Sequence, residues 1–183
     1  VIHFGDDSSG GPWRAWGFGI MNSTDIVGTL QQFLNSGGLN GSKGGGSCVS
    51  GYTPILTANY IYILAQDISA GDELMTYNIT TGQLQPAMVK EVLISYENSS
   101  YVINGYLEIA GDQKVLTERG FIDASNLTLN DTLYDPITNT SIPVFSIEKV
   151  NNPIIMYDFV LVINHNFIGW EYVLADKIAD PCG

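Results

Sequence analysis

The stretch CVSGYTPILT, residues 48–57, decides how the sequence is interpreted. It opens on one of only two cysteines in the chain and runs through Pro54 into the apolar residues of an expected strand. Beyond it, short runs rich in Ile, Val, Tyr and Thr alternate with turn residues, as in the expected strands 86–96, 101–110 and 142–150. The pattern predicts no amphipathic helix longer than two turns in this part, so the expected fold class is all-β.

The residues before this stretch have a different composition, because they hold most of the glycine in the chain. One short helix is expected near residues 25–34, whose apolar side chains fall on one face, and residues 36–47 are typical of a flexible Gly-rich linker. These differences divide the chain into three expected parts: an N-terminal arm with the helix and the linker over 1–47, a β domain over 48–176, and a C-terminal tail over 177–183.

The charge is sparse and negative. The 183 residues include 7 Lys and Arg against 19 Asp and Glu, and only 14% of the chain is charged, compared with about 25% in an average soluble domain. A net charge of −12 argues against nucleic acid, whose binding needs a basic surface, and against anionic membranes. No apolar run approaches the roughly 18 residues of a membrane span. The sequence therefore predicts neither a nucleic-acid partner nor a membrane span.

Sequons for N-glycosylation are more frequent than the composition explains. Seven asparagines begin an Asn-x-Ser/Thr triplet: Asn22, Asn40, Asn78, Asn98, Asn126, Asn130 and Asn139. This excess favours an extracellular, cell-surface protein that carries N-linked glycans. The first residue is Val1 rather than Met, which fits either a removed signal segment or a trimmed chain. The alternative is an Asn- and Thr-rich β protein whose turns match the triplet by accident.

Three blocks in a fixed order resemble the Hint family, the self-processing β fold of inteins and hedgehog C-terminal domains. The first block is residues 48–57 followed by ISAGDELMTY (68–77), the second is LEIAGDQKVLT (107–117) with GFIDA (120–124) and LNDTL (129–133), and the third is MYDFV (156–160), NHNFI (164–168) and VLAD (173–176). The resemblance covers residues 48–176 and implies a Hint-like fold of short twisted strands.

The resemblance also implies a chemistry. In the family, a Cys or Ser attacks the peptide bond before it, and a Thr and a His of the second block assist by handling the proton and the developing charge. In splicing members a terminal Asn then cyclises and cuts its own peptide bond, helped by the His before it.

Seven positions of this chain match the residues of that chemistry: Cys48, Ala110, Gln113, Asp158, His165, Ala175 and Asp176. Cys48 keeps the nucleophile, whereas the second-block Thr and His are replaced by Ala110 and Gln113. The terminal His-Asn pair is replaced by Ala175 and Asp176. Because each lost general acid or base typically costs about 10²- to 10⁴-fold in rate, we expect a natural, catalytically degenerate Hint domain that is not an enzyme.

The two cysteines, Cys48 and Cys182, raise the question of a disulfide. In the family fold the start and the end of the domain meet, and the six residues from Asp176 to Cys182 can span about 20 Å when extended. Export would favour oxidation, so a Cys48–Cys182 disulfide is expected. Two free or buried thiols, a reactive Cys48 and intermolecular pairing are the alternatives.

No cofactor is predicted. With two histidines and two cysteines the sequence has no zinc-binding cluster. The acids at Asp6-Asp7 and at 131–135 do not match the twelve-residue calcium loop, although Ca²⁺ on the surface is left open. Trp13 and Trp16 are either a platform for sugars or, as we favour, anchors of the arm in an apolar groove.

The expected function follows from the lost chemistry, the sequons and the glycine-rich arm. We expect a non-catalytic extracellular structural protein, such as a subunit of a cell-surface filament or sheath, that forms a homo-oligomer or polymer. The arm would dock on a neighbouring subunit, with Val1 to Phe4 adding a strand to a sheet edge. One alternative is a self-processing domain in which Cys48 cuts the Ser47–Cys48 bond. Another is a glycan- or protein-binding surface module.

Overall fold

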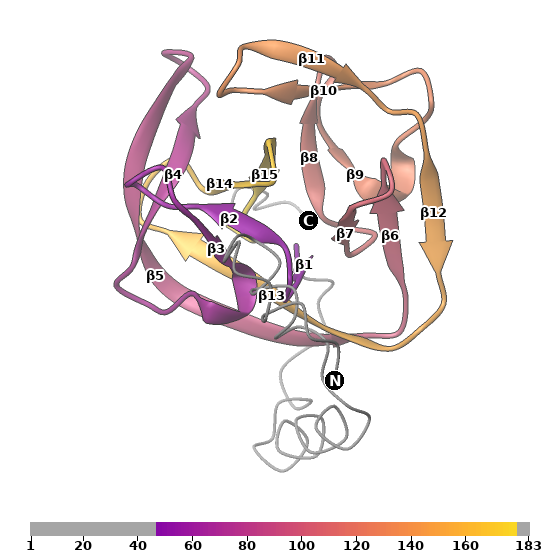
Figure 1. Cartoon of the computed structure of the whole chain (residues 1–183), viewed down its shortest axis with the longest axis horizontal. Coiled ribbons are helices and arrows are strands. Elements are labelled where there is room, and N and C mark those ends of the chain that lie inside the picture. The colour runs from indigo at the N-terminus through magenta and orange to yellow at the C-terminus, as the bar shows by residue number, and fades with distance from the viewer. Residues whose placement is uncertain (1–46, 179–183) are drawn as a thin grey trace, which may run out of the picture. The chain divides into compact units, whose positions relative to one another are not determined.

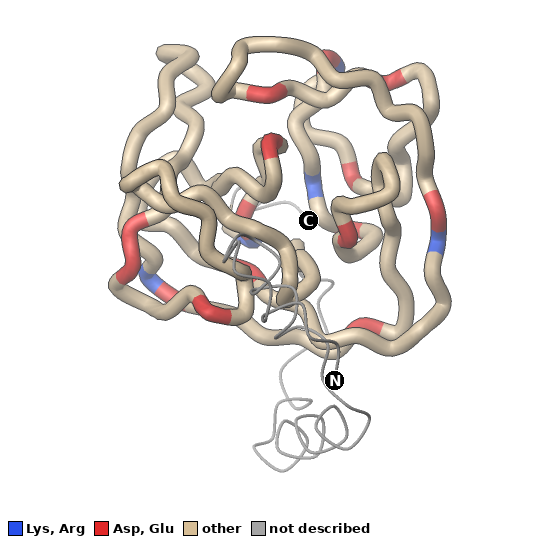
Figure 2. The backbone as a smooth tube through the Cα atoms, in the orientation of Figure 1, with Lys and Arg blue, Asp and Glu red and all other residues tan. Residues whose placement is uncertain are grey.

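A computed structural model describes residues 47–178 (Figure 1). The expected helix near 25–34, the arm with Asn22 and Asn40, and Cys182 lie outside the described residues. The division of the chain into arm, domain and tail therefore stays a prediction. Figure 2 shows that acidic residues outnumber basic ones along the described backbone, and that the basic ones lie apart from one another.

Short strands make up most of the described chain, which confirms the all-β prediction. The strands are β1 (Val49–Ser50), β2 (Pro54–Leu56), β3 (Tyr62–Leu64), β4 (Glu73–Asn78), β5 (Gln83–Glu97), β6 (Ser100–Ile103), β7 (Leu107–Ile109), β8 (Lys114–Thr117), β9 (Gly120–Asp123), β10 (Thr132–Asp135), β11 (Thr140–Pro143), β12 (Ile147–Val150), β13 (Ile154–Leu161), β14 (Asn166–Gly169) and β15 (Tyr172–Ala175). Two single-turn 3₁₀ helices, η2 (Ala65–Asp67) and η3 (Ala124–Asn126), join them. Within residues 47–178, no helix is long and apolar enough to cross a membrane.

Two of the expected strands are each divided in two. The segment expected as a strand over 101–110 is the hairpin of β6 and β7, because Asn104 and Gly105 take φ values of 53° and 82° and turn the chain. Asn–Gly is a strong turn signal, since both residues tolerate positive φ. The segment expected over 142–150 is divided in the same way into β11 and β12 after Pro143, which cannot donate a ladder hydrogen bond.

The strands form two sheets. One has the order β12-β6-β7-β1-β13-β5-β4, and the other has the order β11-β10-β8-β15-β14-β2-β3, with β9 paired to β8. β5 is the longest strand, with 15 residues, and Figure 1 shows it as a curved ribbon. Its first part pairs with β4, and its second part, from Val89 to Glu97, pairs with β13. Every side chain of β14 and β15 is buried, which places the end of the domain in its interior.

The core brings residues together that are far apart in the sequence. β1 has only two residues, yet Val49 pairs with Ile109 of β7 and with Tyr157 of β13. Leu174 of β15 pairs with Val115 of β8. The start of the domain, the second block and the end of the domain therefore converge on one region.

Candidate functional site

Cys48 lies at the centre of this region. Its side chain is 2% exposed and packs in a small apolar cluster with Ala110 and Met156, against which the partly buried Ile154 also packs. The backbone N–H of Ala110 donates to the Cys48 carbonyl at 2.9 Å. The structure thus places a methyl group beside Cys48 at the position where the family resemblance expects a Thr hydroxyl.

Gln113 connects the second block to the end of the domain by hydrogen bonds. Its side chain is fully buried, and its Nε2 donates to the carbonyl of Ala175 at 2.8 Å and to that of Lys114 at 2.9 Å. Its Oε1 has no hydrogen-bond partner among the described residues. An amide has no proton to give to a leaving amine at neutral pH, so Gln113 occupies the expected His position as a structural connector.

Asp158 lies on β13, and in its ionised form it raises the pKa of the Cys48 thiol. Its carboxylate accepts hydrogen bonds from the backbone N–H of Phe159 at 2.9 Å and of Lys177 at 3.1 Å. Burial, and after it the negative charge of Asp176, raise the pKa of Asp158 to about 8. A carboxyl group with such a pKa is largely protonated at neutral pH and can then donate a hydrogen bond.

The buried Asp176 contacts His165, whose side chain is partly exposed. The Asp176 Oδ2 accepts the N–H of Leu161 at 3.0 Å and lies 3.1 Å from the Nδ1 of His165, while Oδ1 accepts the N–H of Ile178 at 2.9 Å. The Asp176 N–H in turn donates to the His165 carbonyl. His165 therefore orients the last residue of the third block, and its ring nitrogen Nδ1 is directed toward Asp176.

The thiol of Cys48 is held in its neutral form. Burial raises its pKa to about 12, the charges of Asp158, Glu97 and Asp112 add to the effect, and a hydrogen bond with Ser95 opposes it. Because the thiolate is the nucleophile, Cys48 has little intrinsic reactivity at neutral pH. Cys48 is also a free thiol, so the structure does not support the expected disulfide with Cys182. The reach of the tail was compatible with that bond, but the Cys48 side chain is packed into the apolar cluster.

Sequence reasoning missed two residues of the site, Ser95 and Glu97. The Ser95 Oγ lies 3.2 Å from the Cys48 Sγ and donates to the Glu97 Oε1 at 3.0 Å. The two residues share one face of β5, because side chains two apart on a strand point the same way. The sequence could have shown that this serine and glutamate share one face of an expected strand. Only the pairing of β5 with β13 shows that this face lies against Cys48.

Of the acids considered as a calcium site, Asp6 and Asp7 lie outside the described residues, and those at 131–135 have other partners. Arg119 binds the Asp131 carboxylate with two hydrogen bonds, of 2.7 and 2.8 Å, and together with backbone donors lowers the pKa of Asp131 to about 2. Asp135 accepts the backbone N–H of Ile137 at 2.8 Å in the turn after β10. Among residues 47–178, no three His, Cys, Asp or Glu side chains are grouped so that they could hold a metal ion.

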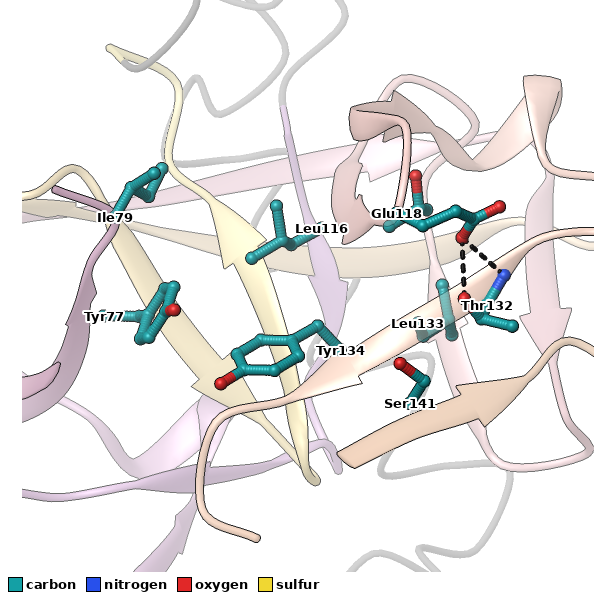
Figure 3. A pocket seen from close by; sticks show the side chains of 9 residues that line it. Tyr77, Ile79, Leu116, Glu118, Thr132, Leu133, Tyr134 and Ser141 are labelled. Carbon is teal, nitrogen blue, oxygen red and sulfur yellow. Dashed lines mark hydrogen bonds between the residues drawn. The ribbon is translucent and has the colours of Figure 1, made fainter. Parts of the chain in front are cut away.

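A separate pocket of about 270 Å³ lies between the tip of the β4–β5 hairpin and strands β8, β10 and β11 (Figure 3). Tyr77 and Tyr134 line it, with their ring centroids 5.4 Å apart. The Tyr134 hydroxyl donates to the Oδ1 of Asn139 at 2.6 Å. None of the seven positions of the family chemistry lines this pocket.

The described sequons are accessible to different degrees. Four have an exposed asparagine: Asn98, Asn126, Asn130 and Asn139. Asn78 is half-buried, and its Oδ1 accepts the backbone N–H groups of Thr80 and Thr81 in the turn after β4. The first four asparagines are therefore accessible to glycosylation.

Known proteins match this chain by structure and not by sequence. No protein-family model and no curated protein sequence matches it. An intein-like domain from Clostridium thermocellum aligns with a TM-score of 0.64 at 23% identity, over 71% of this chain and 98% of that one. A DnaB intein from Synechocystis aligns with a TM-score of 0.63 at 18% identity, over 70% and 97%. The DnaX mini intein from Spirulina platensis gives a TM-score of 0.59 at 22% identity, over 70% and 99%. The described domain therefore has the Hint-like fold of inteins.

Proposed function

We propose that this chain is a non-catalytic structural subunit of an extracellular assembly, built on a Hint-like domain that no longer cleaves its own backbone. The observation that carries the loss of cleavage is the contact of Cys48 with Ala110, together with the burial of Gln113 in a structural hydrogen bond. A methyl group and an amide stand where acyl transfer needs groups that move protons and stabilise charge.

The first step of self-processing shows what is missing. The Cys48 thiol would have to lose its proton and attack the Ser47 carbonyl carbon, and the nitrogen of the broken amide would have to gain a proton. The side chain of Ala110 has no hydroxyl to stabilise the oxyanion, and Gln113 has no acidic proton. Each missing group costs about 10²- to 10⁴-fold, so the thioester should not accumulate.

The last step is blocked in a different way. Asp176 has no amide nitrogen with which to form a cyclic imide. Its carboxylate oxygens are also occupied by the N–H groups of Leu161 and Ile178 and by His165. These contacts support a role for Asp176 in holding the end of the domain rather than in cutting it.

The assembly part of the proposal rests on the sequence. Four described sequons have exposed asparagines, and the chain has few charges that would otherwise provide solubility. We infer that glycans cover this surface and that the arm over residues 1–47 docks on a neighbouring copy. Native material observed by electron microscopy should form filaments or sheets. A protein that stays monomeric in light scattering at all concentrations would contradict this part.

Cleavage is tested on the full chain with dithiothreitol and with hydroxylamine, which intercepts thioesters, followed by intact mass measurement. The natural sequence should stay whole. The double variant Ala110→Thr, Gln113→His should release a fragment that begins at Cys48. The same double variant with Cys48→Ala is the matched control and should stay whole. Release of the fragment from the natural sequence would overturn the proposal.

Self-processing is the second candidate, because Cys48 keeps the nucleophile position at the start of the domain and its sulfur lies within hydrogen-bond distance of the Ser95 hydroxyl. In this alternative the domain cleaves slowly at the Ser47–Cys48 bond. The hydroxylamine experiment on the natural sequence separates the two candidates directly.

A further inference from the structure

Three side chains form a continuous hydrogen-bonded chain that leads away from the nucleophile position. The Cys48 Sγ lies 3.2 Å from the Ser95 Oγ, and the Ser95 Oγ lies 3.0 Å from the Glu97 Oε1. Cys48 and Ser95 are buried, whereas Glu97 is only partly buried and ends the chain. Ser95 lies opposite Met156 in the β5–β13 ladder, and Met156 packs against Cys48, so the sheet itself fixes this alignment.

The direction of the hydrogen bonds follows from the number of protons. The Ser95 hydroxyl has one hydrogen and can donate it to one acceptor at a time. A carboxylate is a much stronger acceptor than a thiol sulfur, so the hydroxyl donates to Glu97. The Ser95 oxygen then has lone pairs free to accept the S–H of Cys48. In this arrangement both bonds point from the thiol toward the carboxylate. When the Ser95 hydroxyl instead donates to the Cys48 Sγ, it stabilises the thiolate and opposes the rise of the thiol pKa, and this is the arrangement left after the proton has moved to Glu97.

We propose that Ser95 relays the proton of the Cys48 thiol to Glu97, so that the domain keeps the half of an active site that would activate its nucleophile. In this step the S–H bond of Cys48 breaks as its proton moves to the Ser95 oxygen, and the Ser95 O–H proton moves to Glu97. The products are a thiolate, an unchanged serine hydroxyl and a neutral carboxylic acid. The inference rests on the proposed function in one respect, namely that the groups which stabilise the oxyanion and protonate the leaving amine are lost at Ala110 and Gln113.

The surrounding charges explain why such a relay is needed. The acids that face Cys48 come from three elements: Asp158 on β13, Glu97 on β5 and Asp112 in the turn before β8. A thiolate formed by releasing its proton to solvent would add a negative charge to this group. Transfer to Glu97 leaves the total charge unchanged, because one carboxylate is neutralised as the thiolate forms. Burial raises the pKa of Glu97, the hydrogen bond from Ser95 opposes this rise, and the nearby Asp112 adds to it. The net increase makes Glu97 a better proton acceptor.

A second serine–glutamate pair in the same sheet provides a matched control. The Ser100 Oγ donates to the Glu108 Oε1 at 2.6 Å, between β6 and β7. Ser100 is buried, and burial raises the pKa of Glu108 as it does for Glu97. This pair has the same chemistry without the Cys48 thiol at its end.

The hydrogen bond itself is tested by infrared spectroscopy of the S–H stretch, which needs no cleavage. The full chain carries Cys182→Ser, so that Cys48 provides the only thiol. The S–H band should lie at the lower frequency of a donating thiol and move to the position of a free thiol in Ser95→Ala. Ser95→Thr and Ser100→Ala should leave it in place. The relay would be overturned if the S–H band already lay at the free-thiol frequency with Ser95 present, or if Ser95→Ala left its frequency unchanged.

The proton transfer is tested by kinetics in the Ala110→Thr, Gln113→His chain. Ser95→Ala and Glu97→Gln should each slow the release of the fragment by about 10²-fold, Ser95→Thr should restore it, and Glu108→Gln should not change it. If Glu97 acted only as a negative charge, Glu97→Gln would make the thiolate easier to form and would speed cleavage, which contradicts the relay. If the double variant releases no fragment, our account of the lost half fails, and the infrared result still decides the relay.

Discussion

The two ends of the domain both bury an ionisable side chain, but in different surroundings. At the first end the Cys48 thiol packs with Ala110 and Met156, and burial raises its pKa to about 12. At the last end the carboxylate of Asp176 is surrounded by two backbone N–H donors and a histidine ring. The first end keeps its reactive atom and lacks the groups that would use it. At the last end, where the family resemblance expects an Asn, the oxygens of Asp176 accept backbone N–H groups.

On the proposed function, this difference describes two ways in which a domain can lose one chemistry. Substitutions beside Cys48 are expected to restore a reaction at the first end at small cost in stability. Substitutions at Asp176 should instead remove contacts on which the end of the domain depends. The predictions that follow measure this contrast.

The largest effect is expected at Asp176. Asp176→Ala removes the acceptor of the buried Leu161 N–H and of the Ile178 N–H. A buried donor left without a partner costs about 1–3 kcal/mol, so we expect the free energy of unfolding to fall by about 3 kcal/mol in urea titrations followed by circular dichroism. Asp176→Asn keeps one acceptor oxygen and should lose less. A loss below about 1 kcal/mol in the Ala variant would remove the structural role that the comparison assigns to this residue.

The next effect is a pH dependence set by Asp158. Its pKa is raised to about 8, from about 3.9 in an unfolded chain. The folded chain therefore binds this proton more tightly, and the resulting stability is complete below about pH 4 and is lost as the pH rises toward 8. Between about pH 5 and pH 7 we expect this group to lower the free energy of unfolding by about 1 kcal/mol per pH unit.

The variant Asp158→Asn isolates this contribution, because it removes the titrating group. It keeps an acceptor oxygen for only one of the Phe159 and Lys177 N–H groups, which bind different oxygens of Asp158, but the cost of the lost bond does not change with pH. Relative to the natural sequence, its stability should increase steadily from pH 5 to pH 7. Urea titrations at several pH values measure the difference. A difference that stays constant over this range would show that Asp158 does not titrate there.

A smaller effect is expected at Gln113, which connects the two ends. Gln113→Met removes the hydrogen bonds to the Ala175 and Lys114 carbonyls but also removes the Oε1 for which the described residues provide no partner. Because the loss and the gain partly cancel, we expect the free energy of unfolding to fall by about 1 kcal/mol. Gln113→Glu is the contrasting variant, since it buries a carboxyl group in place of the donor and should cost more. Equal losses in the two variants would contradict this account.

The smallest effect is expected at Cys48. Cys48→Ala removes one sulfur from the apolar cluster and should lower the free energy of unfolding by about 1 kcal/mol or less. Met156→Ala in the same cluster is the control and should cost about 2–5 kcal/mol. If Cys48→Ala cost as much as Asp176→Ala, the two ends would not differ in the way described.

The order of the three sequence blocks predicted the fold through their resemblance to the Hint family, and turn residues between the blocks fit the same fold. The turn after Asp135 and the turn after Asn78 are marked by residues whose side chains bind the turn backbone, and both turns are present. The blocks also placed Cys48, Ala110 and Gln113 in one region without any knowledge of strand pairing. Such signals are short-range and can be detected in a single sequence.

The missed features depend on long-range geometry or on a local signal that was overlooked. Ser95 reaches Cys48 only through the register of β5 on β13, which no local pattern specifies. The structure does not support the expected disulfide, since Cys48 is a free thiol, and Cys182 lies outside the described residues. The Asn104-Gly105 turn was the exception, since its dipeptide signals a hairpin and could have been recognised.

The two-residue strand β1 has a consequence for the order of events during folding. Val49 pairs with Ile109 and with Tyr157, so the first strand of the domain has no partner until residues far along the chain have arrived. Contacts between such distant residues form slowly, because a long loop must close before they are made. Through that interval the Cys48 thiol lacks the cluster that shields it in the native fold, and it is open to oxidants and electrophiles. Its chemical vulnerability is therefore greatest while the chain is still folding.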